Sequence, residues 1–230
     1  MSPYPAIHPG DPVSIRRMFE RLAPDYDRLN ELLTFGLVRS WRRALVAASG
    51  VTRGSRVVDV CTGTGRSLAA IERTVGTEGL AVGVDFTPGM LARASGRRVL
   101  GDAMRLPMRD GVFDAAVCAF ALRDVADQSR MLKEMRRVTR PGGRVAILEI
   151  GVPERQPFRL GFDLWFRGVV PRVAAAFGQA ESHRFLVRSL DYLPAPNALR
   201  GTMEGLGLVD VGRRDLTLGA ARVFWGTVGG

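Results

Sequence analysis

The sequence is poor in the residues that build metal centres and disulfide networks. It contains only two histidines, His8 and His183, and two cysteines, Cys61 and Cys118, among 230 residues. Neither histidine stands near a cysteine or an acid pair at ligand spacing, so we expect no metal site. Both cysteines lie in or beside apolar strands, which is typical of small buried residues in a reducing compartment. We therefore expect neither a bound metal nor a disulfide framework.

The N-terminal segment lacks an apolar core. Its first dozen residues contain histidine, aspartate and several prolines. A signal peptide or anchor would need a continuous apolar stretch there. We therefore expect a cytoplasmic protein, and the 46% hydrophobic and 24% charged composition is that of one globular domain.

Lysine is almost absent as well. Lys133 is the only one, so a formal net charge of +10 depends on arginine. Such a charge favours nucleic acid or an anionic membrane as a partner. The arginines are scattered, however, and no aromatic-basic stacking motif accompanies them, so we expect no nucleic-acid partner. A nucleic-acid binder stays as the alternative from another class, and its binding would weaken steeply with salt.

A buried strand followed by a glycine turn organises the chain. Residues 56–60 are rich in β-branched side chains and include Asp59 near their end, which is typical of a buried strand. Gly63 and Gly65 follow, and after them apolar residues occur at helical spacing. A dinucleotide loop would have a third glycine where Leu68 stands. A phosphate loop is excluded because no Gly-Lys-Ser/Thr follows. The remaining pattern is an acid followed by Gly-x-Gly.

A second acid supports a nucleoside ligand. Asp85 closes the apolar segment 80–84, twenty residues after Gly65, where a carboxylate can bind both hydroxyls of a ribose. This combination resembles the S-adenosylmethionine (SAM) loop of the class I methyltransferases, which usually have glycine in place of Cys61. The resemblance implies a SAM site formed by Asp59, Thr62, Gly63, Gly65, Asp85, Phe86, Met90, Asp102 and Ala103. Asp102 could instead only stabilise its turn.

Three other segments resemble one family of these enzymes, the ubiquinone/menaquinone-biosynthesis C-methyltransferases. They are residues 26–34 with Trp41, residues 120–124, and residues 137–143 with Glu149. The second segment has Asp124 where the family usually has asparagine. Further departures at Val38, Gly151, His183 and Leu218 fall largely in regions expected to face the acceptor. They leave open a paralogue that methylates another aromatic or lipid.

The resemblance implies a Rossmann-like α/β fold with a seven-stranded, mostly parallel sheet, helices on both faces and an antiparallel last strand. We expect one domain, divided into a helical lid (1–50), a SAM-binding core (51–152), a helical substrate-side insertion (153–195) and a C-terminal helix with strands (196–230). Periodicity alone allows the N-terminal helices to pack on an outer face of the sheet instead. The implied reaction is SAM-dependent C-methylation of a prenylated quinol, with demethylmenaquinol favoured and S-adenosylhomocysteine as the second product.

The candidate catalytic residues come from three parts of the chain. Arg123 follows the strand predicted at 113–122, and we expect it to hold the quinol oxygen together with Tyr26 of the lid. A surface ion pair of Arg123 with Asp124 or Asp127 is the alternative. His183 is a rival base, because histidine titrates near neutrality and a family tyrosine is frequent at this position.

The insertion carries a dense apolar patch within residues 158–177, interrupted by charges. It could line a pocket for an oily substrate, touch the inner face of the membrane as a peripheral contact, or simply pack in the core. The oligomeric state is open, with a homodimer among the options.

Overall fold

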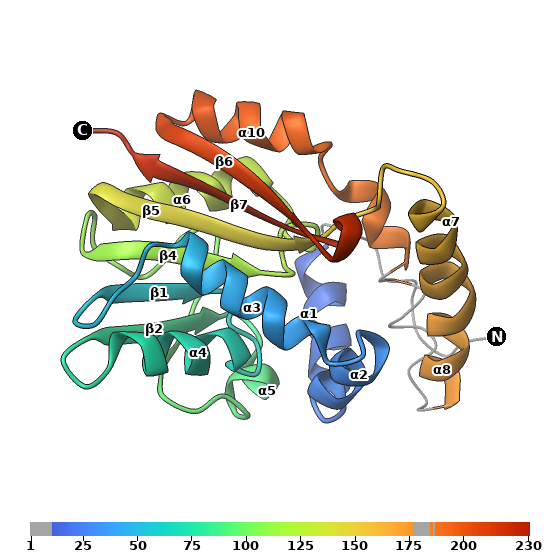
Figure 1. The fold of residues 1–230 in the computed structure, drawn as a ribbon. Coiled ribbons are helices and arrows are strands. Elements are labelled where there is room, and N and C mark those ends of the chain that lie inside the picture. Colours follow the sequence, from blue (N-terminus) through green and yellow to red (C-terminus); the bar gives the residue numbers. More distant parts are fainter. Residues whose placement is uncertain (1–10, 177–184, 186) are drawn as a thin grey trace.

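A computed structural model describes residues 11–176, 185 and 187–230. Within them, one seven-stranded sheet has the order β3-β2-β1-β4-β5-β7-β6. β7 is antiparallel to both of its neighbours, and the other pairings are parallel. The predicted fold is therefore confirmed (Figure 1). The strands are β1 Arg56–Val60, β2 Leu80–Asp85, β3 Arg97–Leu100, β4 Phe113–Ala119, β5 Thr139–Ile150, β6 Leu208–Leu216 and β7 Ala221–Val228.

Helices cover both faces of this sheet. α3 (Leu37–Ala48) and α4 (Arg66–Val75) share one apolar cluster with the sheet, and α6 (Gln128–Val138) and α10 (Pro196–Gly205) share the other. Central β1 is buried from both sides, with Val57, Val58 and Val60 at 0% exposure. Burial of such a side chain stabilises the fold by about 1.5 to 3 kcal/mol. The two-sided core explains the continuous apolar run of β1.

Apolar side chains at helical spacing place the covering helices. In α6 the buried residues Met131, Leu132, Met135 and Val138 form one stripe at helical spacing. Asp127 caps this helix by accepting from the backbone N–H of Arg130 at 2.9 Å. Periodicity and capping are local properties, so they could be recognised in the sequence.

Two local features differ from what the sequence favours. Threonine is a common N-cap residue, but the Thr87 side chain makes no hydrogen bond to α5 (Pro88–Leu91), and the Thr87 backbone N–H donates to Asp85 Oδ1 at 2.8 Å. β4 ends at Ala119 and not near residue 122, because Phe120 adopts a left-handed conformation with φ of +62°. Such a conformation is strained for a bulky residue and interrupts the strand. Both differences concern the ligand-facing edge of the sheet.

The predicted lid region divides into two parts. α3 packs against the sheet through Trp41 and Leu45. This is the alternative in which the N-terminal helices pack on an outer face of the sheet. α1 (Pro12–Leu22) and α2 (Tyr26–Leu33) lie beyond the end of the sheet, as Figure 1 shows. The insertion forms one continuous helical segment there, made of α7 (Phe158–Asp163), the π-helical η1 (Leu164–Val169) and α8 (Val170–Ala176). No helix in the described part of the chain is long and apolar enough to cross a membrane.

Candidate active site

The glycine loop between β1 and α4 is tied to both neighbouring strands. The Thr62 backbone N–H donates to the Val84 carbonyl of β2 at 3.0 Å, and its hydroxyl donates to Asp59 Oδ2 at 2.6 Å. Gly63 and Gly65 have φ of +57° and +77°, which glycine adopts readily. Cys61 has a similar φ of +56° and is only half-buried, unlike the fully buried cysteine expected.

Asp85 organises the loop from the end of β2. Its Oδ2 accepts from the Gly63 backbone N–H and its Oδ1 from that of Thr87, both at 2.8 Å. Burial raises the pKa of Asp85, and these backbone hydrogen bonds oppose the rise. The carboxylate therefore fixes the loop in addition to its predicted role with the ribose, which stays a prediction.

The loop borders a cavity whose chemistry fits SAM. Gly63, Asp85, Phe86 and Met90 line it at the carboxyl ends of β1 and β2. A Cβ on Gly63 would meet nothing within 4 Å, so the space beside the loop is open. Asp59 Oδ1 is buried without a hydrogen-bond partner in the described structure, but Asp59 does not line this cavity, so its contact with SAM stays a prediction. Burial raises the pKa of Asp59 to about 7, although the hydrogen bond from Thr62 acts to lower this pKa.

Asp102 and Ala103 lie apart from this lining. Asp102 is exposed, and its Oδ1 accepts from the Met104 backbone N–H at 2.8 Å. This is the turn-stabilising arrangement given as the alternative. Ala103 is buried in the core at 7% exposure. Contact of either residue with adenine stays a prediction.

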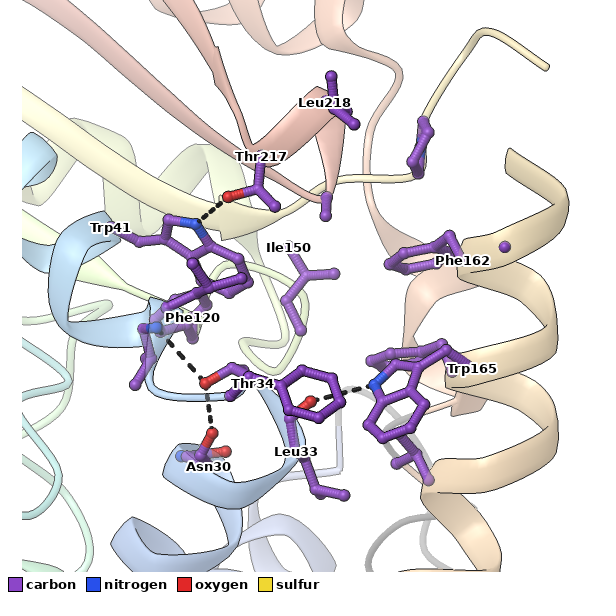
Figure 2. Close-up of a pocket in the computed structure, with 18 of the residues that line it drawn as sticks. Asn30, Leu33, Thr34, Trp41, Phe120, Ile150, Phe162, Trp165, Thr217 and Leu218 are labelled. Carbon is purple, nitrogen blue, oxygen red and sulfur yellow. Dashed lines mark hydrogen bonds between the residues drawn. The ribbon is translucent and has the colours of Figure 1, made fainter. Parts of the chain in front are cut away.

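A larger, mainly apolar cavity of about 380 Å³ adjoins the first. Figure 2 shows its walls, to which α2, α3 and the insertion contribute. Trp165 of the insertion donates to the Leu33 carbonyl at 3.0 Å, and its ring packs against Phe35 with centroids 4.7 Å apart. Trp41 donates to Thr217 Oγ1 at 2.8 Å. The insertion thus forms a wall of a cavity and does not only pack in the core.

Tyr26, Phe120 and Asp124 line both cavities and mark their junction. Burial raises the pKa of the Tyr26 phenol, while the charge of Arg42 opposes the rise. Arg42, which the sequence analysis missed, places its guanidinium 5.6 Å from the centre of the Phe120 ring. A reactive centre between a cofactor and an acceptor would lie at this junction.

Arg123 lines the larger cavity and is only 3% exposed. A surface location is therefore wrong, but the ion pair with Asp124 given in that alternative is present in the interior, with Arg123 Nε 4.0 Å from Asp124 Oδ1. Its Nη1 forms a hydrogen-bonded ion pair with Glu149, and its Nε donates to Ser189 Oγ at 3.0 Å. Glu149 also accepts from the backbone N–H groups of Leu122 at 3.1 Å and Ile150 at 2.9 Å. Glu149 belongs to one of the segments that resemble the family, and its position there did not indicate this pairing with Arg123.

Asp124 lies beside this pair with a different environment. It is 7% exposed, and neither carboxylate oxygen has a hydrogen-bond partner among the described residues. Its nearest cationic atom is Arg123 Nε, 4.0 Å from Oδ1. Burial raises the pKa of Asp124 to about 7, although Arg123 favours the charged form. His183, the rival base, lies outside the described residues.

The described residues include no group of three or more histidine, cysteine, aspartate or glutamate side chains that could hold a metal ion. Metal independence stays a prediction, to be tested by chelation.

The fold, the glycine loop and Asp85 define the class I SAM-dependent methyltransferases. A SAM-dependent methyltransferase from Thermotoga maritima has a TM-score of 0.66 with 19% identity, covering 93% of this chain and 99% of that one. Another from Aquifex aeolicus has a TM-score of 0.61 with 17% identity, covering 88% and 97%. These likenesses establish the fold.

The sequence pattern of the ubiE/COQ5 methyltransferase family matches residues 10–228, and the chain belongs to that family. It is 38% identical over 224 residues to the ubiquinone/menaquinone biosynthesis C-methyltransferase UbiE of Geobacter sp. strain M21, covering 93% of this chain and 95% of the relative. It is 40% identical over 220 residues to the demethylmenaquinone methyltransferase of Roseiflexus castenholzii, covering 92% of each. The predicted family and SAM-dependent enzyme class are confirmed.

Proposed function

We propose that the protein transfers the methyl group of SAM to a ring carbon of a prenylated quinol, with demethylmenaquinol as the favoured acceptor. The observation that supports this most is the apolar cavity of about 380 Å³ that meets the cofactor cavity at Tyr26, Phe120 and Asp124. A fused aromatic ring with an oily tail needs such a lining, with polar groups only where its oxygens lie. The names of the relatives point to the same acceptor class.

SAM, when bound, supplies an electrophilic methyl group, so the protein's task is placement and control of charge. Arg123 suits the second task, because Glu149 and Ser189 fix its guanidinium at the cavity wall. A guanidinium does not accept a proton near neutrality but stabilises negative charge on a ring oxygen. Tyr26 lines the same cavity and can donate its hydroxyl to that oxygen.

The cofactor cavity implies movement of α1. Ile15 and Phe19 of α1 lie against it, and its volume is about 60 Å³. Typical ligand pockets hold about 300 Å³ or more, so SAM requires α1 to shift outward. In this proposal α1 and α2 form the lid, and α3 belongs to the sheet's covering layer.

The insertion is proposed to carry the isoprenoid tail and to touch an anionic membrane surface. Leu160 and Leu164 are 57% and 64% exposed, and Arg159 and Arg167 lie on the same segment with side chains 56% and 50% exposed. Exposed apolar side chains beside cations suit an interface of acidic headgroups. This contact is consistent with a cytoplasmic protein that takes its acceptor from the inner face of the membrane.

Quinone profiling tests the proposed function. The protein is expressed in cells that lack their own quinone methyltransferase, and quinones are identified by mass spectrometry. We expect these cells to contain menaquinone again when they express the wild-type protein, and not when they express Asp85→Ala. Unmethylated quinones in cells that contain folded wild-type protein would contradict the proposal. They would favour the paralogue that methylates another aromatic or lipid.

A further inference from the structure

Asp124 is a buried carboxyl group with no hydrogen-bond partner in the described structure, placed where the two cavities meet. Buried polar groups are normally paired, and an unpaired buried carboxylate is costly. Such a group in a cleft is a candidate for a functional role. Its position between donor and acceptor cavities gives it access to both.

The other polar groups that the structure describes near the junction are unsuited to accept a proton. Glu149 already accepts from Leu122, Ile150 and Arg123. Asp85 accepts from two backbone N–H groups of the loop. Arg123 stays protonated, and Tyr26 has its phenol pKa raised by burial, so the neutral phenol persists. Asp124 is the carboxylate at the junction whose two oxygens accept no hydrogen bond from the described residues, with Arg123 Nε 4.0 Å from Oδ1.

We propose that Asp124 is a catalytic residue, which accepts the hydroxyl proton of the quinol while the adjacent ring carbon is methylated. This inference rests on the proposed function. The electron pair of the O–H bond moves into the ring, which forms the new carbon–carbon bond with the methyl group. The sulfur–methyl bond breaks, and its electron pair stays on sulfur as a thioether. The methylated carbon then loses its proton to water, and the ring oxygen regains a proton from Asp124. One proton is released overall, and Asp124 returns to its carboxylate form.

The surrounding charges poise Asp124 for this exchange. Arg123 favours the carboxylate, whereas burial and the charge of Glu149 disfavour it. The phenol of Tyr26 is the further titratable group at this junction. With a pKa of about 7, a substantial fraction of Asp124 is ionised near neutrality, and proton transfer in either direction is easy. The transfer rate should therefore rise with pH through about 7 and then level off.

Asp124→Asn tests the inference, with Asp127→Asn as the matched control. Asparagine has nearly the same shape as aspartate and is the residue usual in the family at this position. Its amide can form a hydrogen bond with a hydroxyl group but cannot accept the proton of that group. Asp127 caps α6, and asparagine caps helices equally well. Single-turnover methyl transfer to demethylmenaquinol is measured from about pH 5 to about pH 9, which brackets the expected pKa. SAM affinity is measured by calorimetry in parallel.

We expect Asp124→Asn to slow transfer by about 10² or more, the usual lower range for general-base catalysis. The transfer rate of this variant should no longer change its pH dependence near pH 7, and the variant should bind SAM normally. Asp127→Asn should keep both the wild-type rate and the wild-type pH profile. A wild-type rate and pH profile in Asp124→Asn would overturn the inference and leave the proposed function intact. Inactivity of folded wild type with the quinol would instead overturn the proposed function, and this inference with it.

Two readouts are independent of turnover. The infrared difference between wild type and Asp124→Asn should contain a protonated-carboxyl band that disappears as pH rises through about 7. Asp59, whose pKa is also raised to about 7, contributes to both proteins and cancels in this difference. Because the folded pKa lies above the ordinary carboxyl value, wild type loses stability as pH rises toward 7. The Tm of Asp124→Asn should therefore exceed that of wild type by a margin that grows between about pH 4 and about pH 7 and is constant above. A pH-independent difference in Tm would contradict the assigned ionisation.

Discussion

Removal of Glu149 should destabilise the protein far more than removal of an exposed acid. Glu149 and Arg123 are 2% and 3% exposed, so Glu149→Ala leaves the Arg123 guanidinium buried without its counter-ion. Breaking a buried pair in this way costs about 3 to 5 kcal/mol. The backbone N–H groups of Leu122 and Ile150 also lose their acceptor, which adds to the cost. A domain of this kind has a stability of about 5 to 15 kcal/mol, so the loss is a large fraction of the total.

Urea unfolding monitored by circular dichroism measures this loss. The matched control is Glu31→Ala, which breaks the Arg39–Glu31 pair at 2.7 Å, whose side chains are 69% and 34% exposed. An exposed pair contributes about 0.2 to 1 kcal/mol. The double variant Arg123→Met/Glu149→Leu should recover much of the loss, because the two charges of the pair are removed together and Asp124, which then lacks Arg123, can take up a proton. If Glu149→Ala lost no more than Glu31→Ala, the assigned burial of the Arg123–Glu149 pair would be refuted.

Four further outcomes follow from the site. Asp85→Ala should weaken SAM binding by about 1.5 to 3 kcal/mol in calorimetry, because charge-assisted hydrogen bonds are lost. Unchanged SAM affinity in a folded variant would contradict the assignment of Asp85 to the ribose. Arg123→Ala should lower the single-turnover methyl-transfer rate by about 10² or more with SAM affinity nearly unchanged, and a near-normal rate would remove Arg123 from the chemistry. Trp165→Ser should raise KM for a long-chain quinol and spare SAM binding; an unchanged KM in a folded variant would mean that Trp165 serves only packing. Turnover should survive extensive chelation, whereas its loss and recovery with magnesium would favour a metal-assisted mechanism.

The cofactor half of the site could be predicted because its signals are local. The acid of β1, Gly63 and Gly65 lie within one strand-turn-helix unit, and Asp85 ends the next strand. Parallel strands bring their carboxyl ends to one edge, so these residues had to meet. Apolar residues at helical spacing are likewise a local pattern, and in α3 and α6 they form the buried faces. Residues 26–34 with Trp41, residues 120–124 and residues 137–143 with Glu149 together indicated the family.

The acceptor half depended on contacts between distant segments. Trp165 bonds to Leu33 across 132 positions, and Arg123 pairs with Glu149 across 26. Exposure and hydrogen-bond partners are not encoded in spacing, so the sequence left open whether Arg123 faces the quinol or forms a surface ion pair. Asp124 stood out in the sequence only as a departure from the asparagine usual in the family, and its burial without a hydrogen-bond partner became visible in the structure.

The sequence by itself determined the fold class, the order of the elements and the residues of the SAM loop, because hydrophobic periodicity and turn-forming residues act over a few positions. The tertiary structure alone decided which charges are buried, which are paired, and where the two cavities join. The energy of a charge depends on the medium and on the groups around it in space. Those groups come from α2, from the segment that follows β4, from β5 and from the insertion.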